Sequence, residues 1–246
     1  MKETTENISL NKYISATGYC SRREADKLIE QGRVVINHNI ANPGTRVSAT
    51  DKIFIDDELL KTVGSSQQNQ FIIAFNKPVN VTSTTDEKDR SNIIRYINHP
   101  KRIFPIGRLD KDSEGLIFLT NNGDFVNKIL RSGNEHEKEY LVTVNKKLTT
   151  DFAFKMSTGV RILDTVTLPC KVKTISSKVF SIILKQGLNR QIRKMCEVFG
   201  YEVVSLKRVR IMHIKIGNLA IGKWRYLSEP EMNELTQLLE KSKNSI

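Results

Sequence analysis

The chain has 246 residues, which is long enough to bury a sizeable hydrophobic core without disulfide or metal cross-links. Lys and Arg number 39 and Asp and Glu 27, for a net charge of +12, and the hydrophobic content of 39% is typical of a globular protein. Residues 1–60 carry eight basic and nine acidic side chains, a net charge of −1, so residues 61–246 carry +13. This positive excess predicts a partner rich in phosphate.

Several classes of site and location are excluded. The longest apolar runs are far shorter than the roughly 20 residues that a membrane-spanning helix needs, and the polar N-terminus lacks a signal-peptide core. We therefore expect a cytoplasmic protein, and a monomer by default. Cys20, Cys170 and Cys196 stand alone, the four histidines are widely spaced, and no phosphate-binding loop motif occurs. The sequence predicts no metal site.

The first 60 residues predict two helices followed by a small sheet. Leu10, Tyr13 and Ile14 have helical spacing, and the run from Ser21 to Glu24 is a capping box that opens a second helix. Gly32 is placed to end that helix, and residues 34–36 and 52–55 have the composition of short strands. A polar stretch at 61–70 then interrupts the apolar pattern. We predict a small domain at 8–60, a linker at 61–70 and a larger domain at 71–246.

The larger domain alternates predicted strands with few helices. Residues 71–75 and 115–120 read as buried strands, 139–144 as an alternating strand, and 171–175 with 178–184 as a hairpin. A helix is predicted at 189–199, ended by Gly200, and a capping box at 228–231 opens a C-terminal helix. The pattern predicts an α+β fold with a central mixed or antiparallel sheet.

The densest segment is Gly107 to Asp124, in which a loop of alternating charge leads into an apolar strand and then an Asn-Gly turn. Periodicity alone does not decide between a solvated strand entry and a catalytic loop, because a single aspartate in a loop is weak evidence for catalysis. The motifs around this segment carry further information.

The small domain resembles the S-four RNA-binding domain over about residues 8–55, through Leu10–Ile14, Cys20–Ala25, Gly32–Val34 and Ile36–Asn37. The resemblance implies that its two helices bind structured RNA. The basic residues expected to contact RNA are Lys12, Arg22, Arg23 and Arg33.

The larger domain resembles pseudouridine synthases of the RsuA/RluB/RluF subfamily. The resemblance rests on four motifs in family order: Phe75–Pro78 with Ser83–Thr85, Gly107–Asp110, Lys138–Val142 and Gly187–Met195. The segments 104–106, 127–130 and 135–140 are most similar to the RluF branch. The resemblance implies isomerisation of a uridine in 23S rRNA, and also of one in the anticodon loop of tRNA-Tyr, without a cofactor.

The resemblance also implies roles for individual residues. Asp110 is expected to attack C1′ of the nucleotide or to remove the proton from C2′. Arg193 is expected to hold Asp110 ionised, and Tyr140 to stack on the target base. Leu206 matches a pocket leucine, although a purely structural position is nearly as good an interpretation.

Further RNA contacts are expected along the same surface, because residues 185–215 hold eight basic and two acidic side chains, a net charge of +6. The residues expected to bind substrate there and in the loop are Arg108, Asn189, Arg190, Gln191, Lys194 and Arg208.

Two alternatives remain open at this point. A non-enzymatic ribosome-binding or assembly factor would also carry an S-four domain and a positive charge. A nucleoside hydrolase would need a second carboxylate near Asp110, and Asp112 and Glu114 are available.

Overall fold

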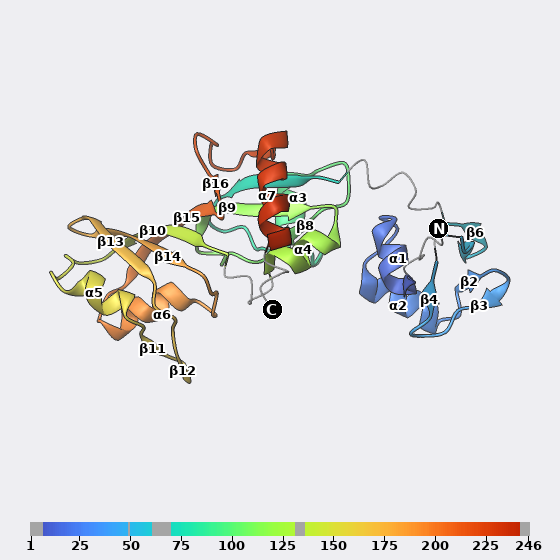
Figure 1. Ribbon diagram of the computed structural model, residues 1–246, viewed down its shortest axis with the longest axis horizontal. Helices are drawn as coiled ribbons and strands as arrows, with labels where there is room; N and C mark the ends of the chain where they lie inside the picture. The colour runs from blue at the N-terminus through green and yellow to red at the C-terminus, as the bar shows by residue number, and fades with distance from the viewer. Residues whose placement is uncertain (1–6, 49, 61–69, 131–135, 242–246) are drawn as a thin grey trace. The chain divides into compact units, whose positions relative to one another are not determined.

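The computed structural model describes residues 7–48, 50–60, 70–130 and 136–241 (Figure 1). The chain divides into two units, one formed by residues 1–70 with 121–123 and the other by residues 71–120 with 124–246. The predicted linker at 61–70 lies outside the described residues except for Gln70. Each unit is described by itself.

The first unit is the predicted pair of helices with a small sheet. The predicted capping box is present, because Glu24 N donates to Ser21 Oγ at 3.2 Å and Ser21 N donates to Glu24 Oε2 at 2.6 Å. Two antiparallel sheets follow the orders β3-β2-β5-β6 and β1-β4. The elements are β1 (Ile8–Ser9), α1 (Leu10–Ala16), α2 (Arg22–Glu30), β2 (Val34–Ile36), β3 (Asn39–Ile40), β4 (Arg46–Val47), β5 (Ile53–Ile55) and β6 (Glu58–Leu59).

The second unit is built on a nine-stranded sheet. Its main path is β13-β14-β10-β15-β9-β7-β17, with β16 on β15 and β8 on β9. All its pairings are antiparallel except β15 with β9, which confirms the α+β fold with a mixed sheet. The strands are β7 (Ile72–Lys77), β8 (Phe104–Ile106), β9 (Glu114–Thr120), β10 (Lys138–Val144), β13 (Lys171–Ser176), β14 (Val179–Leu184), β15 (Val203–Ile211), β16 (Ile214–Lys215) and β17 (Trp224–Tyr226).

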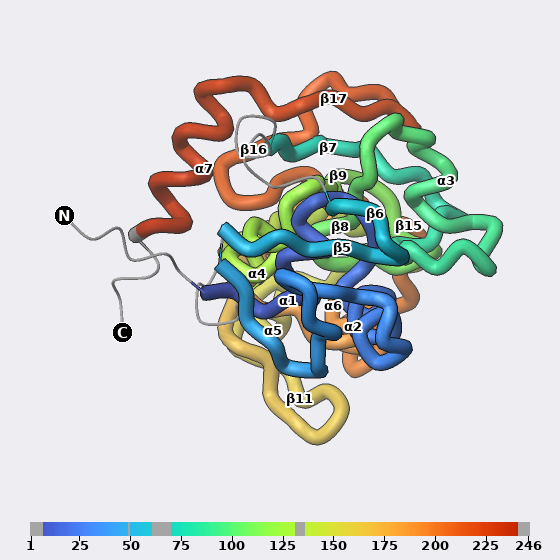
Figure 2. Tube along the Cα trace, turned by 90° about the vertical axis from the view of Figure 1, so that its right-hand side faces the viewer, coloured from blue at the N-terminus to red at the C-terminus, as the bar shows by residue number. Residues whose placement is uncertain are grey.

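Helices cover both faces of the sheet around β7 and β9. Residues of one parity, such as Ile72 and Phe118, pack against α7 (Glu229–Lys241) and α4 (Gly123–Leu130). Residues of the other parity, such as Ile73 and Ile117, pack against α3 (Ile93–Ile97). Figure 2 shows α7 and α3 on opposite sides of these strands. The strands are apolar on both faces because both faces are covered.

A separate core fills the other half of the sheet. It joins β10, β14 and β15 to α5 (Phe152–Ser157) and α6 (Gln191–Val198), with Phe152, Phe180 and Met195 fully buried. A short hairpin, β11 (Arg161–Ile162) with β12 (Thr165–Val166), flanks this core. The two halves meet at the β15–β9 pairing, which is the only parallel pairing between strands of this sheet in the described residues.

The meeting of β15 and β9 requires a glycine. Gly115 has φ +107°, and a Cβ atom there would lie 2.3 Å from the carbonyl oxygen of Arg208. Because that neighbour is backbone, the strands would have to separate to admit a side chain.

We expect Gly115→Ala to lower the free energy of unfolding by about 3 kcal/mol or more, from strand displacement together with the strained φ. Urea denaturation followed by circular dichroism measures the effect. Gly217→Ala is the matched control, because Gly217 also has a positive φ (+53°) but no atom within 4 Å of the place that an added methyl group would take. An equal loss of stability in the two variants would contradict the importance of the close approach.

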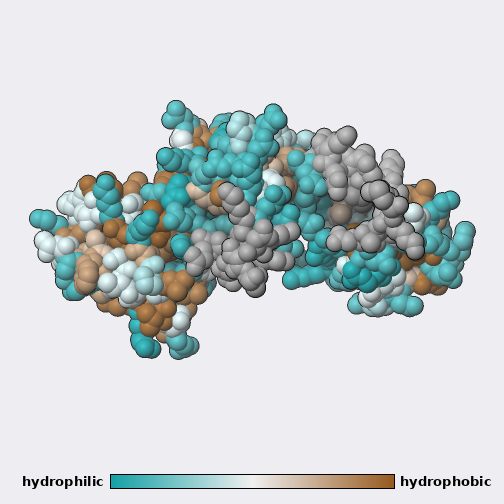
Figure 3. Space-filling view, viewed as in Figure 1, coloured by the Kyte–Doolittle hydropathy of each residue, from teal (hydrophilic) through white to brown (hydrophobic). Residues whose placement is uncertain are grey.

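Large hydrophobic side chains are exposed in several places in the second unit. They gather around α5 and the β11–β12 hairpin, where Phe154 is 71% exposed and Leu163 is 57% exposed, and brown surface is visible over this part in Figure 3.

Within the described ranges, no helix combines the length and apolar character needed to cross a bilayer.

Candidate active site

The loop between β8 and β9 is fixed on both sides of Asp110. On one side, the buried Ser83 hydroxyl donates to Leu109 O at 2.8 Å and accepts from Leu109 N at 3.2 Å. On the other side, Asn80 N donates to Lys111 O at 2.7 Å. Ser113 N also closes a turn onto Asp110 O at 3.1 Å. The main chain that carries Asp110 is therefore held by the segment that follows β7.

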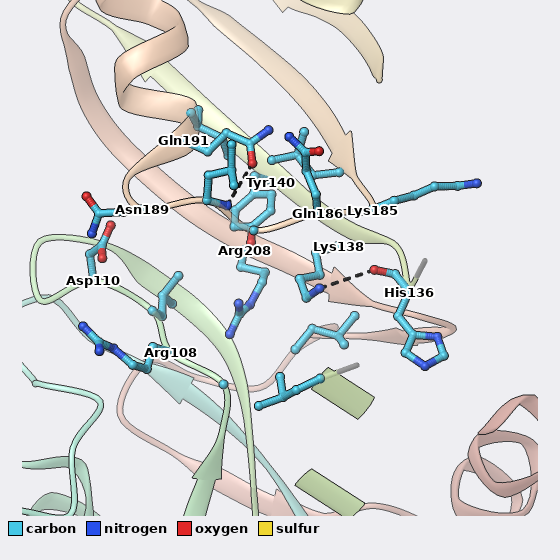
Figure 4. Close-up of a pocket in the computed structure, with 18 of the residues that line it drawn as sticks. Arg108, Asp110, His136, Lys138, Tyr140, Lys185, Gln186, Asn189, Gln191 and Arg208 are labelled. Atoms are coloured by element: carbon cyan, nitrogen blue, oxygen red, sulfur yellow. Dashed lines mark hydrogen bonds between the residues drawn. The ribbon is translucent and has the colours of Figure 1, made fainter. Parts of the chain in front are cut away.

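Asp110 lies at the mouth of a cavity of about 650 Å³ between the two halves of the sheet (Figure 4). Its side chain is 34% exposed, so the carboxylate is accessible to a ligand. Figure 4 shows Asp110 and Asn189 close together at one side of the cavity, with Tyr140 and Arg208 in its middle. The volume suits a nucleotide base with its ribose.

The prediction that Arg193 pairs with Asp110 is wrong: among the described residues, the carboxylate that Arg193 contacts is that of Asp112. The guanidinium that faces Asp110 belongs to Arg190, whose Nη1 lies 3.8 Å from Asp110 Oδ2. Both Nη atoms of Arg190 also donate hydrogen bonds to the Asp112 carboxylate, at 3.1 and 2.9 Å. The predicted helix at 189–199 begins later, at Gln191, because Arg190 has a left-handed backbone with φ +50° that turns its side chain toward the loop.

Arg193 is buried, with 9% of the residue exposed. Its Nη1 donates to Val203 O at 3.0 Å, and its Nη2 donates to Asp112 O at 2.9 Å and to Ser113 Oγ at 3.3 Å. Nη2 also lies 3.3 Å from Asp112 Oδ2. Arg193 thus ties α6 and β15 to the loop two residues beyond Asp110.

Asp112 is held by two guanidinium groups. The hydrogen bonds from Arg190, opposed by partial burial and helped by the charge of Arg193, hold the pKa of Asp112 below its ordinary value. A carboxylate that is kept ionised and occupied in this way is poorly suited to donate a proton as a general acid. The arrangement argues against Asp112 as the second carboxylate of a hydrolase.

Tyr140 and Arg208 form the middle of the cavity wall. Tyr140 lies opposite Arg208 in the β10–β15 register, and the Arg208 guanidinium carbon is 6.0 Å from the centre of the tyrosine ring. Arg208 is only 4% exposed, and its Nε donates to Leu116 O at 2.6 Å. Arg208 therefore forms part of the cavity lining with little of its surface exposed, and its expected contact with RNA stays a prediction. Leu206 lines the cavity and also packs in the core.

The remaining residues predicted to bind substrate differ in accessibility. Arg108 and Asn189 are accessible at the cavity, and Lys194 Nζ donates to Asn189 Oδ1 at 3.1 Å. Gln191 is 4% exposed, and its Oε1 accepts from Leu188 N at 3.1 Å. Gln191 lines the cavity and also closes the loop before α6, and its expected contact with substrate stays a prediction.

The predicted basic residues of the first unit also fall into different settings. Arg22 and Arg23 are exposed on the first turn of α2, and Lys12 is half-buried on α1. Arg33 makes a two-point ion pair with Asp56, at 2.7 Å from Nε and 2.5 Å from Nη2. This pairing leaves Arg33 less suited to bind phosphate than the two arginines of α2.

Lys77 is a buried residue for which the sequence predicts no role, although it lies in one of the four motifs. It is 0% exposed at the end of β7, and its Nζ donates to Pro78 O at 2.9 Å and Val81 O at 2.8 Å. Burial, with the nearby charge of Arg208, lowers the pKa of Lys77 from its ordinary 10.5 to about 8, against the opposing pull of Asp112, Asp110 and Glu114. These contacts fix the turn that holds the loop of Asp110.

We expect the buried Lys77 to make stability rise with pH. Its folded pKa of about 8 is below the ordinary 10.5, so the cost of burying its charge is fully present below pH 8 and disappears as the pH rises to 10.5. The difference of 2.5 (10.5 − 8) corresponds to about 3 kcal/mol. Urea midpoints of the wild type and Lys77→Met between pH 7 and about 10.5 test this expectation. Parallel pH profiles for the two proteins would contradict it.

Comparison with known proteins gives the family. The model for RNA pseudouridylate synthases matches residues 71–198, and the S4 domain model matches residues 9–53. The chain is 53% identical over 98% of its length to the dual-specificity RNA pseudouridine synthase RluF of Escherichia coli K12, covering 82% of that protein. It is 31% identical to the ribosomal large subunit pseudouridine synthase B of Bacillus subtilis, over 96% of this chain and 98% of that one.

A solved structure supports the same conclusion. The crystal structure of a pseudouridylate synthase is 27% identical, covers 93% of this chain and 99% of its own, and superposes with a TM-score of 0.67. A chain with an S4 RNA-binding domain and this sheet and loop is an RNA-modifying enzyme rather than a binding factor alone. The chain belongs to the RNA pseudouridylate synthase family, and it isomerises uridine in RNA.

Proposed function

We propose that the chain converts one uridine of 23S rRNA and one uridine in the anticodon loop of tRNA-Tyr to pseudouridine, acting as a monomer in the cytoplasm. The observation that supports this substrate choice is the 53% identity, over 98% of the chain, to a relative named as a dual-specificity RNA pseudouridine synthase. The exposed Arg22 and Arg23 of the S4 domain are suited to bind the phosphates of folded RNA.

The reaction needs little beyond a carboxylate and a closed pocket. The N1–C1′ bond breaks, the uracil turns, and C5 bonds to C1′; the proton on C5 is released and N1 takes up a proton, so the composition is unchanged. In the proposed mechanism Asp110 either attacks C1′ or removes the C2′ proton. No redox step and no external source of energy enter this balance. His, Cys, Asp and Glu side chains form no group suited to holding a metal ion within the described ranges.

The neighbours of Asp110 have distinct proposed roles. Tyr140 stacks on the extruded uracil, with the Arg208 guanidinium carbon 6.0 Å from the centre of its ring. Leu206 packs against the base, and Arg108 and Asn189 bind the sugar-phosphate at the mouth. Arg190 Nη1, 3.8 Å from Asp110 Oδ2, faces the reacting carboxylate. Arg193 keeps the loop in place through its main-chain contacts.

Mapping of pseudouridines in a deletion strain tests the choice of substrate. We expect one pseudouridine to disappear from 23S rRNA and one from tRNA-Tyr, and both to return with the wild-type gene but not with a gene carrying Asp110→Asn. Loss from rRNA alone would contradict the dual specificity. Restoration by the Asp110→Asn gene would contradict the role of the aspartate.

A further inference from the structure

A second cavity, of about 500 Å³, lies beside the first. The two cavities share three consecutive residues of the fixed loop, Arg108, Leu109 and Asp110. The two cavities therefore adjoin at this stretch of the loop. The other residues that line the second cavity are Thr82, Ser83, Thr84, Asp86, Asp89 and Lys111.

Two exposed cations line the second cavity, and one of them, Arg108, belongs to the wall that the two cavities share. The charge of the other, Lys111, contributes to lowering the pKa of Asp89. The two cations flank Leu109 and Asp110. Ser83 holds the main chain of Leu109, and Asn80 holds that of Lys111. Cations held on a rigid loop next to the reacting carboxylate are suited to bind the phosphate that follows or precedes the target uridine.

Another part of the lining of the second cavity carries two carboxylates whose positions are set by local turns. Asp86 Oδ1 accepts from Lys88 N at 3.0 Å, and Asp89 Oδ1 accepts from Ser91 N at 2.8 Å and Ser91 Oγ at 2.6 Å. Hydrogen bonds from Ser91 and from the Thr82 side chain lower the pKa of Asp89 and occupy part of its carboxylate. The remaining lone pairs of the Asp86 and Asp89 carboxylates can accept from a ligand. An ionised carboxylate only accepts hydrogen bonds, so this side of the cavity favours a base edge that presents an amine.

We propose that the second cavity binds the nucleotide next to the target uridine and selects a base with an exocyclic amine there. Arg108 and Lys111 hold the phosphate between the two nucleotides, and Asp86 and Asp89 accept from the amine of adenine, cytosine or guanine. Uracil fits less well because it carries carbonyl oxygens and no exocyclic amine. The proposal rests on the proposed function, since it places the target uridine against Asp110.

The test uses synthetic RNA hairpins that contain the uridine identified by the deletion-strain map. Each of its two neighbours is varied through the four bases, with any paired partner changed to match, and kcat/KM is measured by tritium release from 5-tritiated uridine. With the wild type, we expect uracil at one neighbouring position to lower kcat/KM about tenfold relative to the best amine-bearing base.

The Asp86→Asn/Asp89→Asn double variant should reduce that ratio to about threefold or less, because the amide offers a donor where the carboxylate offered an acceptor. Asparagine retains an oxygen for Lys88 N and Ser91 N, so the turns are preserved. Glu87→Gln is the matched control, because Glu87 is exposed on the same loop but does not line the cavity. It should leave the base preference unchanged.

A second pair of variants tests the phosphate contact. Lys111→Gln should lower kcat/KM for all hairpins alike and reduce the salt dependence by about one ion, whereas Lys88→Gln, outside the cavity, should not. A wild type with no base preference at either neighbour would overturn the proposal, and so would an unchanged preference in the double variant. Wild-type turnover of the hairpins supports the proposed function whichever result is obtained, so the two failures are distinguishable.

Discussion

Asp110→Asn is expected to abolish tritium release from 5-tritiated uridine in RNA, by about a thousandfold or more, while RNA affinity stays within a few fold. Asparagine has the shape of aspartate, and the main-chain contacts of Leu109 and Lys111 that fix the loop do not involve the carboxylate. The loss would therefore fall on the chemical step. Single-turnover assays with saturating enzyme separate that step from binding.

Asp112→Asn is the matched control, because it removes another carboxylate from the same loop. That carboxylate pairs with Arg190 and Arg193. We expect it to weaken the positions of these arginines and to reduce turnover by far less than Asp110→Asn. Retained turnover in Asp110→Asn, or an equal loss of turnover in the two variants, would contradict the assignment of the chemistry to Asp110.

The fold could be predicted from the sequence where local signals are strong. The capping boxes at Ser21 and Ser228 open α2 and α7 as expected, because they rely on contacts three residues apart. The buried strands β7 and β9 are visible as apolar runs. The parallel pairing of β15 with β9 is not visible, because it depends on a close backbone approach at Gly115 between residues far apart in sequence.

The site was predictable only in part. Asp110, Tyr140 and Asn189, which lie in three of the motifs, line one cavity together with Leu206. They do not decide which arginine faces which aspartate, because that choice depends on the left-handed turn at Arg190. Nor does a sequence pattern show that Arg208 and Gln191 are buried, since both are polar and lie among charged neighbours.

The contacts of Arg193 give a prediction that distinguishes its shape from its charge. The planar guanidinium reaches Val203 O on one side and Asp112 O with Ser113 Oγ on the other. The single ammonium of lysine is not able to span both sides with the same geometry. Arg193→Lys would leave a buried acceptor unsatisfied and release the loop that carries Asp110, so turnover should fall about a hundredfold or more.

Lys194 provides the control for charge on the same helix. It is half-buried, and its Nζ contacts Asn189 Oδ1 at 3.1 Å. Lys194→Met removes a charge from α6 without touching the loop, so its main expected effect is a weaker salt dependence of RNA binding. The measurement is single-turnover kcat for both variants, together with urea midpoints that confirm folding. If Arg193→Lys turns over at nearly the wild-type rate, or if positions 193 and 194 lose equally, then α6 contributes only a cationic surface and the loop does not depend on the guanidinium.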